Sequence, residues 1–181
     1  SRCQVFRMHS PSRRVLAQTV TDIAKKEGFE LKKDAADLIA IAADGSFRDA
    51  LGVTQKVIMA SGDTIGDGDE VAAIIGAPKR AIIAELIDGL HEKDAEKALS
   101  AVAQVVADHG DMKLFVRLLL ERVRAVMLLR NMPNKKDDLL AAFSEKDQEQ
   151  LEKLAAEAGS PLNSHALTRL LAAAAGMGKT Q

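Results

Sequence analysis

The sequence contains no tryptophan and no tyrosine, and phenylalanine occurs only five times in 181 residues. Many proteins that bind single-stranded nucleic acid stack the bases on aromatic side chains, so an aromatic platform of that kind is excluded. An excess of one charge is also lacking, because 25 basic and 26 acidic residues give a formal net charge of -1. No global field therefore attracts nucleic acid or an anionic membrane, and any contact with DNA would have to be local.

Cysteine occurs once, at Cys3, which excludes an internal disulfide framework and is typical of a protein of the reducing cytoplasm. No apolar run approaches the roughly 20 residues that a membrane helix needs. The opening residues SRCQVFRMHS do not have the pattern of a signal peptide. They also begin without Met, so we expect the chain to be a piece of a longer cytoplasmic protein.

Helical periodicity dominates what is present, in a chain that is 47% hydrophobic and 28% charged. It predicts an all-α fold, beginning with a small bundle of three helices over residues 10–76. Ser10 and Pro11 are expected to cap and open the first helix. A second helix is expected over about 33–43, and a third over about 47–62. The apolar faces predicted for the first and third helices are Val15, Leu16, Thr19, Val20 and Ile23, and Phe47, Ala50, Leu51, Thr54, Val57 and Ile58.

The clearest break in the chain is the stretch GDTIGDGDEVAAIIGAPKR, where glycine and proline surround one short helix over about 69–75. We place a domain boundary at Gly76 and Ala77. Beyond it, residues 77–181 are expected to form a second helical bundle of about five helices around a central one over 112–129. The polar stripe predicted on that helix is Arg117, Glu121 and Arg124, and a face predicted on the preceding helix is Ala98, Leu99, Val102, Val105 and Val106.

Several local matches to chemical motifs fail on closer reading. The tail GMGKTQ resembles the end of a phosphate-binding loop, but Ala173 stands where its first glycine belongs and a helix precedes it. The stretch DTIGDGDE lacks ligands at the third and twelfth positions of a calcium loop, where Ile65 and Ile74 stand. The four histidines are scattered, and the carboxylates are expected on solvated helix faces. We therefore predict no metal site and no nucleophile with its base.

The stretch DGSFRDAL raises a more specific question. Ser46 is predicted to cap the third helix, with Asp49 closing a capping box, so Arg48 falls in the first turn. A cation is disfavoured there by the helix dipole unless an anion joins it. From the residues alone, that anion is equally well a phosphate group or the carboxylate of Asp44 or Asp49.

The sequence SRCQVF, followed some forty residues later by ADGSFRDALGVTQKVI, resembles the AAA+ clamp-loader ATPases, and among them the tau/gamma subunits of bacterial DNA polymerase III. The resemblance implies that residues 1–9 end an ATPase domain, 10–76 form its helical lid and 77–181 form a collar, here truncated. By the same resemblance Arg2 is an arginine finger that acts in trans. Arg48 is the sensor 2 residue on the ATP phosphates, and Phe47 lines the nucleotide pocket.

The resemblance further implies an enzyme, an ATPase of the DNA polymerase complex that uses ATP and Mg²⁺ to load the sliding clamp onto primed DNA. Its partners would be other clamp-loader subunits through the collar, and the clamp and primer–template DNA mainly through the ATPase domain. The Walker motifs of that domain are absent from this sequence, so the chain alone is not expected to bind or hydrolyse ATP. The alternatives are a replication factor C-like ATPase subunit and a non-enzymatic helical adaptor.

Overall fold

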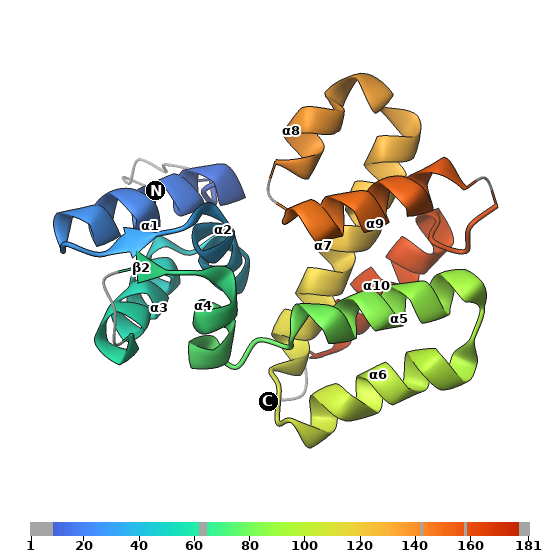
Figure 1. Ribbon diagram of the computed structural model, residues 1–181, viewed down its shortest axis with the longest axis horizontal. Helices are drawn as coiled ribbons and strands as arrows, with labels where there is room; N and C mark the ends of the chain where they lie inside the picture. Colours follow the sequence, from blue (N-terminus) through green and yellow to red (C-terminus); the bar gives the residue numbers. More distant parts are fainter. Residues whose placement is uncertain (1–8, 62–64, 142, 158, 178–181) are drawn as a thin grey trace, which may run out of the picture. The chain divides into compact units, whose positions relative to one another are not determined.

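The structure is a computed structural model that describes residues 9–61, 65–141, 143–157 and 159–177. Helices make up nearly all of the regular structure in these ranges, which confirms the predicted all-α class (Figure 1). The chain divides into two compact units, residues 1–71 and 72–181. This division lies upstream of Gly76 and Ala77, and the boundary between lid and collar stays a prediction. Among the described residues, no helix is long and apolar enough to cross a membrane.

The first unit is a small bundle in which one helix packs against two others. Its elements are α1 (Arg13–Lys26), β1 (Glu30–Leu31), α2 (Lys33–Ala42), α3 (Phe47–Ala60), β2 (Ile65–Gly66) and the start of α4 (Gly68–Ile75). Helix α1 contacts both α2 and α3. The side chains of Leu16, Val20, Ile39 and Val57 are fully buried at the centre. The apolar faces of the three helices therefore pack together in one core.

The start of α1 differs from the prediction. Ser12, not Ser10, is the N-cap, and the helix begins at Arg13. The Ser12 side chain accepts a hydrogen bond from the backbone N–H of Val15 at 3.4 Å. Because Ser12 meets the first free N–H groups of the helix, Pro11 lies outside the helix and does not open it.

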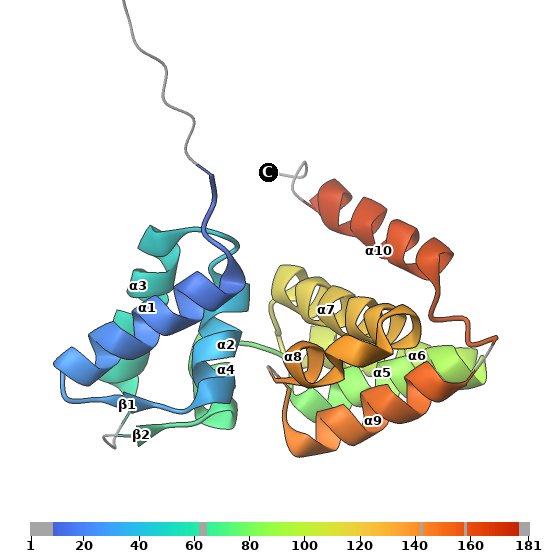
Figure 2. The ribbon, with the colours of Figure 1, turned by 90° about the horizontal axis from the view of Figure 1, so that it is seen from above.

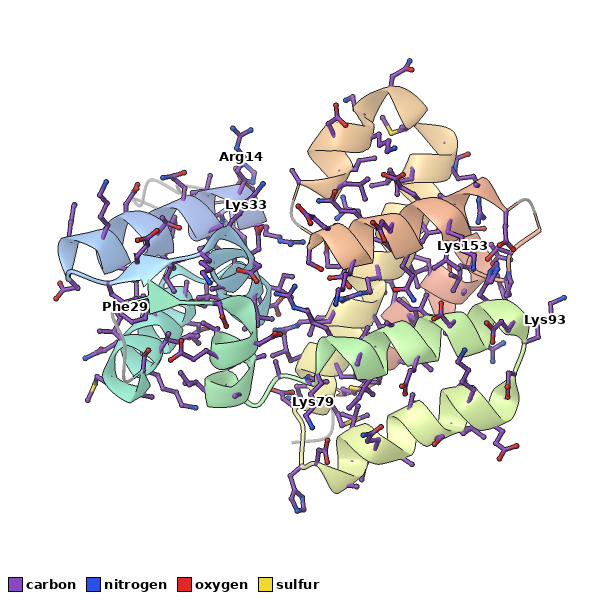
Figure 3. The ribbon with its side chains drawn as sticks, in the orientation of Figure 1. Arg14, Phe29, Lys33, Lys79, Lys93 and Lys153 are labelled. Atoms are coloured by element: carbon purple, nitrogen blue, oxygen red, sulfur yellow. The ribbon has the colours of Figure 1, made fainter. Side chains whose placement is uncertain are left out.

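A short parallel pairing of β1 with β2 ties the chain after α3 back to the loop before α2. Gly66 lies against the buried ring of Phe29, which is labelled in Figure 3. A Cβ atom at Gly66 would lie 2.9 Å from Cε1 of Phe29, so the ring leaves room only for glycine. The following loop caps α4, because Oδ1 of Asp67 accepts from the backbone N–H groups of Asp69 and Glu70.

The second unit surrounds one long helix. Its elements are α5 (Arg80–Glu92), α6 (Ala95–Ala107), α7 (Met112–Asn131), a 3-10 turn (Pro133–Lys135), α8 (Lys136–Leu140), α9 (Glu145–Ala156) and α10 (Ser164–Met177). Helix α7 contacts α5, α8, α9 and α10, which confirms its predicted central position. Helix α6 packs on α5, and α10 lies along another side of α7 (Figure 2).

One prediction for the second unit was wrong, because charged groups lie inside it. Arg122 of α7 is only 5% exposed, and it falls outside the single polar stripe that the sequence indicated. Its Nη2 donates a 3.0 Å hydrogen bond to Oδ1 of Asp147 on α9, which is 9% exposed. The expectation that carboxylates lie on solvated faces therefore fails for Asp147. It also fails for Asp37 in the first unit.

Candidate functional site: the start of helix α3

The turn between α2 and α3 has two consecutive residues with left-handed backbone, Asp44 with φ 49° and Gly45 with φ 80°. Ser46 then adopts an extended conformation, and its side chain accepts from the backbone N–H of Asp49 at 3.2 Å. The predicted N-cap is therefore confirmed. The reciprocal half of the capping box is not formed, because the Ser46 N–H donates to the carbonyl of Ala43 at 3.0 Å instead.

This cap places Arg48 in the first turn of α3, with its side chain exposed. Within the part of the chain that the structure describes, Arg48 forms no ion pair, so neither Asp44 nor Asp49 neutralises it. The backbone N–H groups of Phe47 and Arg48 likewise have no acceptor among the described residues. Two backbone donors, the positive end of the helix dipole and a guanidinium group therefore lie together at one helix end. This donor set suits a phosphate group.

Two large apolar side chains flank Arg48 on the surface of α3. Phe47 is 44% exposed, and Leu51, one helical turn later, is also exposed. The prediction that both are buried was wrong. The buried side of α3 consists of Ala50, Thr54 and Val57, and Phe47 and Leu51 lie at its edge. Exposed apolar groups beside a set of anion donors form a surface suited to a ligand or to another domain.

The same turn closely approaches the segment that leads into α1. A Cβ atom built on Gly45 would lie 3.3 Å from Cβ of Ser10. Glycine is needed here both for this approach and for its positive φ. Arg2 lies outside the described residues, so its predicted role stays a prediction.

A buried ionic feature of this unit, which joins α1 to α2, was not predicted from the sequence. Oδ1 of Asp37 lies 3.6 Å from Nε of Arg13. Burial raises the pKa of Asp37 above its usual value, and the charges of Arg13 and Lys33 partly oppose that rise (Lys33 is labelled in Figure 3). Asp37 stands among the small and apolar residues Ala36, Ile39 and Ala40, and that setting was the available signal of burial.

No group of three or more histidine, cysteine or acidic side chains suited to a metal ion occurs among the residues described. The groups described above give the candidate site its positive charge, its free N–H groups and its apolar surface.

Two family models match parts of this chain. Residues 15–63 match the model of the ATPase lid domain of the DNA polymerase III clamp-loader subunit. This part of the chain is therefore similar to the lid domain of that subunit. Residues 67–171, more than half of the chain, match domain III of DNA polymerase III subunits gamma and tau. The chain belongs to this family of gamma and tau subunits.

Several individual proteins are similar to this chain. DNA polymerase III subunit tau of Bacillus subtilis is 27% identical over 133 residues, which are 74% of this chain and 23% of that protein. Replication factor C small subunit 1 of Pyrobaculum islandicum is 35% identical over 110 residues, 61% of this chain and 33% of that protein. The solved Bacillus subtilis DNA clamp loader delta protein aligns over 95% of this chain and 52% of its own, at 14% identity and a TM-score of 0.43. The chain spans a minor part of the two curated relatives.

Proposed function

We propose that this chain is the lid and collar of a clamp-loader subunit whose longer form uses ATP binding and hydrolysis to load a sliding clamp onto primed DNA. In this proposal residues 10–76 are the lid and 77–181 the collar. The observation that carries it is Arg48, a cation at a capped helix start with no anionic partner among the described residues. The clamp and the primer–template DNA would be bound mainly by the ATPase domain, and other loader subunits by the collar.

Arg48 has the chemistry required of a residue that detects nucleotide in its own subunit. A guanidinium forms two parallel, charge-assisted hydrogen bonds with a phosphate group. Because Arg48 is fixed near the start of α3, such bonds would draw the whole lid toward the nucleotide, as in hinge closure. Phe47 and Leu51 would supply the apolar contact beside the phosphates, with Phe47 lining the nucleotide pocket.

Bound ATP with Mg²⁺ supplies the phosphoryl group that is transferred to water. The donor set at α3 fits the negative charge of its phosphates, and no residue described here is proposed to hold the metal ion. Arg2 is proposed to act on the ATP of a neighbouring subunit, where an arginine finger contributes about 10³ to 10⁵ in rate. Hydrolysis would then depend on assembly of the ring.

A replication factor C-like subunit is the second candidate, favoured by the relative with 35% identity. By the resemblance of the sequence to these families, Asp49, an acid directly after Arg48, favours the bacterial subunits over it. Both candidates require a strand and a Walker A loop upstream of Ser1 in the longer protein. The order and content of those upstream domains distinguish them.

The test uses the longer protein that includes the ATPase domain. We expect Arg48→Ala to weaken ATP binding by about tenfold to a hundredfold, because it removes a charge-assisted pair of hydrogen bonds. Arg48→Lys should recover little, since an ammonium group cannot form the bidentate pair. Arg2→Ala should leave ATP binding intact and abolish the stimulated turnover. Equilibrium ATP binding and steady-state hydrolysis with clamp and primed DNA measure the two effects separately.

Lys56→Ala is the matched control, because Lys56 is an exposed cation two turns further along α3. Its ATP binding should equal that of the parent. Parental clamp loading by both Arg48→Ala and Arg2→Ala would refute the proposed roles. Equal losses in Lys56→Ala and Arg48→Ala would assign the effect to general charge on the lid.

A further inference from the structure

Helix α10 is held only lightly against the rest of its unit. None of its residues, all of which the structure describes, is buried, although the helix contacts α7. Leu167, Leu170 and Ala174 recur at helical spacing and are half-buried, and Leu171 is 53% exposed. Because apolar stabilisation grows with the area that is removed from water, the contact between α10 and α7 is a weak one.

The residues directly before α10 are held much more firmly. Leu162 is 1% exposed and Ser160 is 6% exposed. Arg130, near the end of α7, donates from Nη1 to the carbonyl of Leu162 at 3.2 Å and from Nη2 to the carbonyl of Leu154 at 3.1 Å. Its Nε donates to the carbonyl of Ala155 at 3.4 Å. One guanidinium group therefore ties the last turn of α9 to the residues that lead into α10.

His91 of α5 holds the same stretch through its two ring nitrogens. Nε2 lies 2.7 Å from Oε2 of Glu157, and Nδ1 lies 2.9 Å from Oγ of Ser160. A carboxylate only accepts, so in the neutral ring Nε2 carries the proton and the Ser160 hydroxyl donates to Nδ1. The same hydroxyl oxygen accepts from the backbone N–H of Leu162 at 3.3 Å. This order of groups resembles that of a serine hydrolase, but Ser160 is buried, so the bonds serve attachment.

We propose that α10 is an arm that swings away from α7 as one body, on a pivot formed by residues 160–163 that stays fixed. His91 and Arg130 fix the pivot, and we call these two residues the latch. Figure 2 shows how the chain after α9 leads into α10, which lies beside α7. Swinging of the arm uncovers the side of α7 that α10 covers, without unfolding of the unit. This device is additional to the proposed clamp-loading function and does not depend on it.

The start of α10 allows the arm to leave α7 as a helix. Oδ1 of Asn163 accepts from the backbone N–H groups of His165 at 3.0 Å and of Ala166 at 3.2 Å. This cap is made within the chain at the joint, so it is kept when α10 leaves α7. A helix of 14 residues is nevertheless marginal on its own, so the amide hydrogens of the freed arm exchange readily with solvent.

Native-state hydrogen exchange of this chain tests the proposal. The amides of residues 168–175 should exchange together, at least about tenfold faster than those of α7, and low concentrations of urea should change their exchange little. The amide of Leu162 should exchange as slowly as those of α9. Protection then changes in one step between pivot and arm. A gradual decline of protection toward the end of α10, or protection equal to that of α7, would overturn the inference.

Variants of the latch separate the pivot from the arm. Arg130→Ala and His91→Ala should each speed exchange of the Leu162 amide by about tenfold, because each removes hydrogen bonds at the pivot. Exchange in residues 168–175 should hardly change, because the arm already opens on its own. Arg124→Ala, the loss of an exposed cation on the same helix α7, is the matched control and should change neither. Far-ultraviolet circular dichroism verifies that each variant is folded.

Two results of this comparison would overturn the inference. If exchange in α10 rises by the same factor as at Leu162, arm and pivot open as one body. If Arg124→Ala acts like Arg130→Ala, the latch is not specific. Should a latch variant fail to fold, the exchange profile of the parent chain still decides whether the arm opens as one unit.

Distances between spin labels supply a second test, in a Cys3→Ser background and diluted with unlabelled chain. Labels at Arg124→Cys on α7 and Ala172→Cys on α10 should give two distances by double electron–electron resonance, the longer one from the swung arm. Labels at Arg124→Cys and Lys153→Cys on α9 should give one (Lys153 is labelled in Figure 3). A single narrow distance for the first pair would overturn the inference. These experiments contain no nucleotide, so their outcome is independent of the test of Arg48 in ATP binding.

Discussion

Removal of the buried carboxylate of Asp147 should strongly destabilise the second unit. Asp147 accepts from Nη2 of Arg122 at 3.0 Å and lies 3.9 Å from Nη1 of Arg80. The Nε atom of Arg122 is buried without a hydrogen-bond partner. Asp147 therefore provides much of the interaction that offsets the burial of this guanidinium charge. Asp147→Ala would leave a guanidinium that is 5% exposed without this anion. Breaking a buried pair in this way costs about 3 to 5 kcal/mol.

The loss of a local contact adds to this cost. The Ser144 hydroxyl caps α9 by accepting from the Asp147 N–H at 3.3 Å, and it donates to Oδ2 of Asp147 at 2.9 Å. Asp147→Ala retains the backbone cap and removes the second bond, at a cost of about 1 kcal/mol. The total of about 4 to 6 kcal/mol is a large part of the 5 to 15 kcal/mol that stabilises a typical domain.

Urea unfolding followed by far-ultraviolet circular dichroism is the suitable assay, because the chain has no tryptophan or tyrosine to report by fluorescence. Hydrogen exchange of α7 and α9 assigns the loss to the second unit. The double variant Arg122→Met with Asp147→Leu should recover most of the stability, since no charge is then left buried. A loss below about 1 kcal/mol in Asp147→Ala, or a double variant as unstable as the single one, would refute this account.

Two further predictions concern packing and protonation. Gly89→Ala should destabilise the packing of α5 on α6 by about 1 to 3 kcal/mol, because the new Cβ would lie 2.8 Å from the backbone nitrogen of Ala98. Gly52→Ala is the contrasting change: its Cβ would have nothing within 4 Å, so it should stabilise α3 by about 0.5 to 1 kcal/mol. Urea unfolding measures both changes in the free energy of unfolding. The raised pKa of Asp37 means that the folded state binds this proton more tightly than the unfolded state does. The contribution of Asp37 to the free energy of unfolding therefore falls as pH rises from the unfolded-state pKa near 3.8 through the higher folded-state pKa. Above the folded-state pKa this contribution is constant. Asp37→Asn should remove that slope in unfolding experiments across this pH range, and an unchanged slope would contradict it.

The helices could be predicted from the sequence where periodicity and a local cap agree. The short helix α4 and the central α7 begin within one residue of their predicted positions, because glycine and aspartate mark those starts. At α1 two serines precede the helix, and the pattern alone chose the wrong one. A cap depends on which hydroxyl meets a free N–H group, and two candidates two residues apart look alike in sequence.

Burial was harder to predict than helix position. Phe47 and Leu51 fit an apolar stripe equally well whether or not another element covers them, and they remain exposed. The pair formed by Arg122 and Asp147 joins residues that stand 25 positions apart, so no local pattern indicates it. Both errors have one cause, because tertiary neighbours decide which part of a helix surface is covered.

At Arg48 the sequence predicted the local structure, but only the fold shows which residues contact the side chain. The sequence placed a cation where the helix dipole disfavours it, and left a carboxylate and a phosphate as equal candidates for its anion. In the fold the cap forms as predicted, and neither Asp44 nor Asp49 pairs with Arg48. The cost of the cation is therefore not offset by another residue that the structure describes. An anion from outside this unit accounts for the arrangement best, which is why exchange of Arg48 for alanine should change ATP binding more than it changes the stability of the lid.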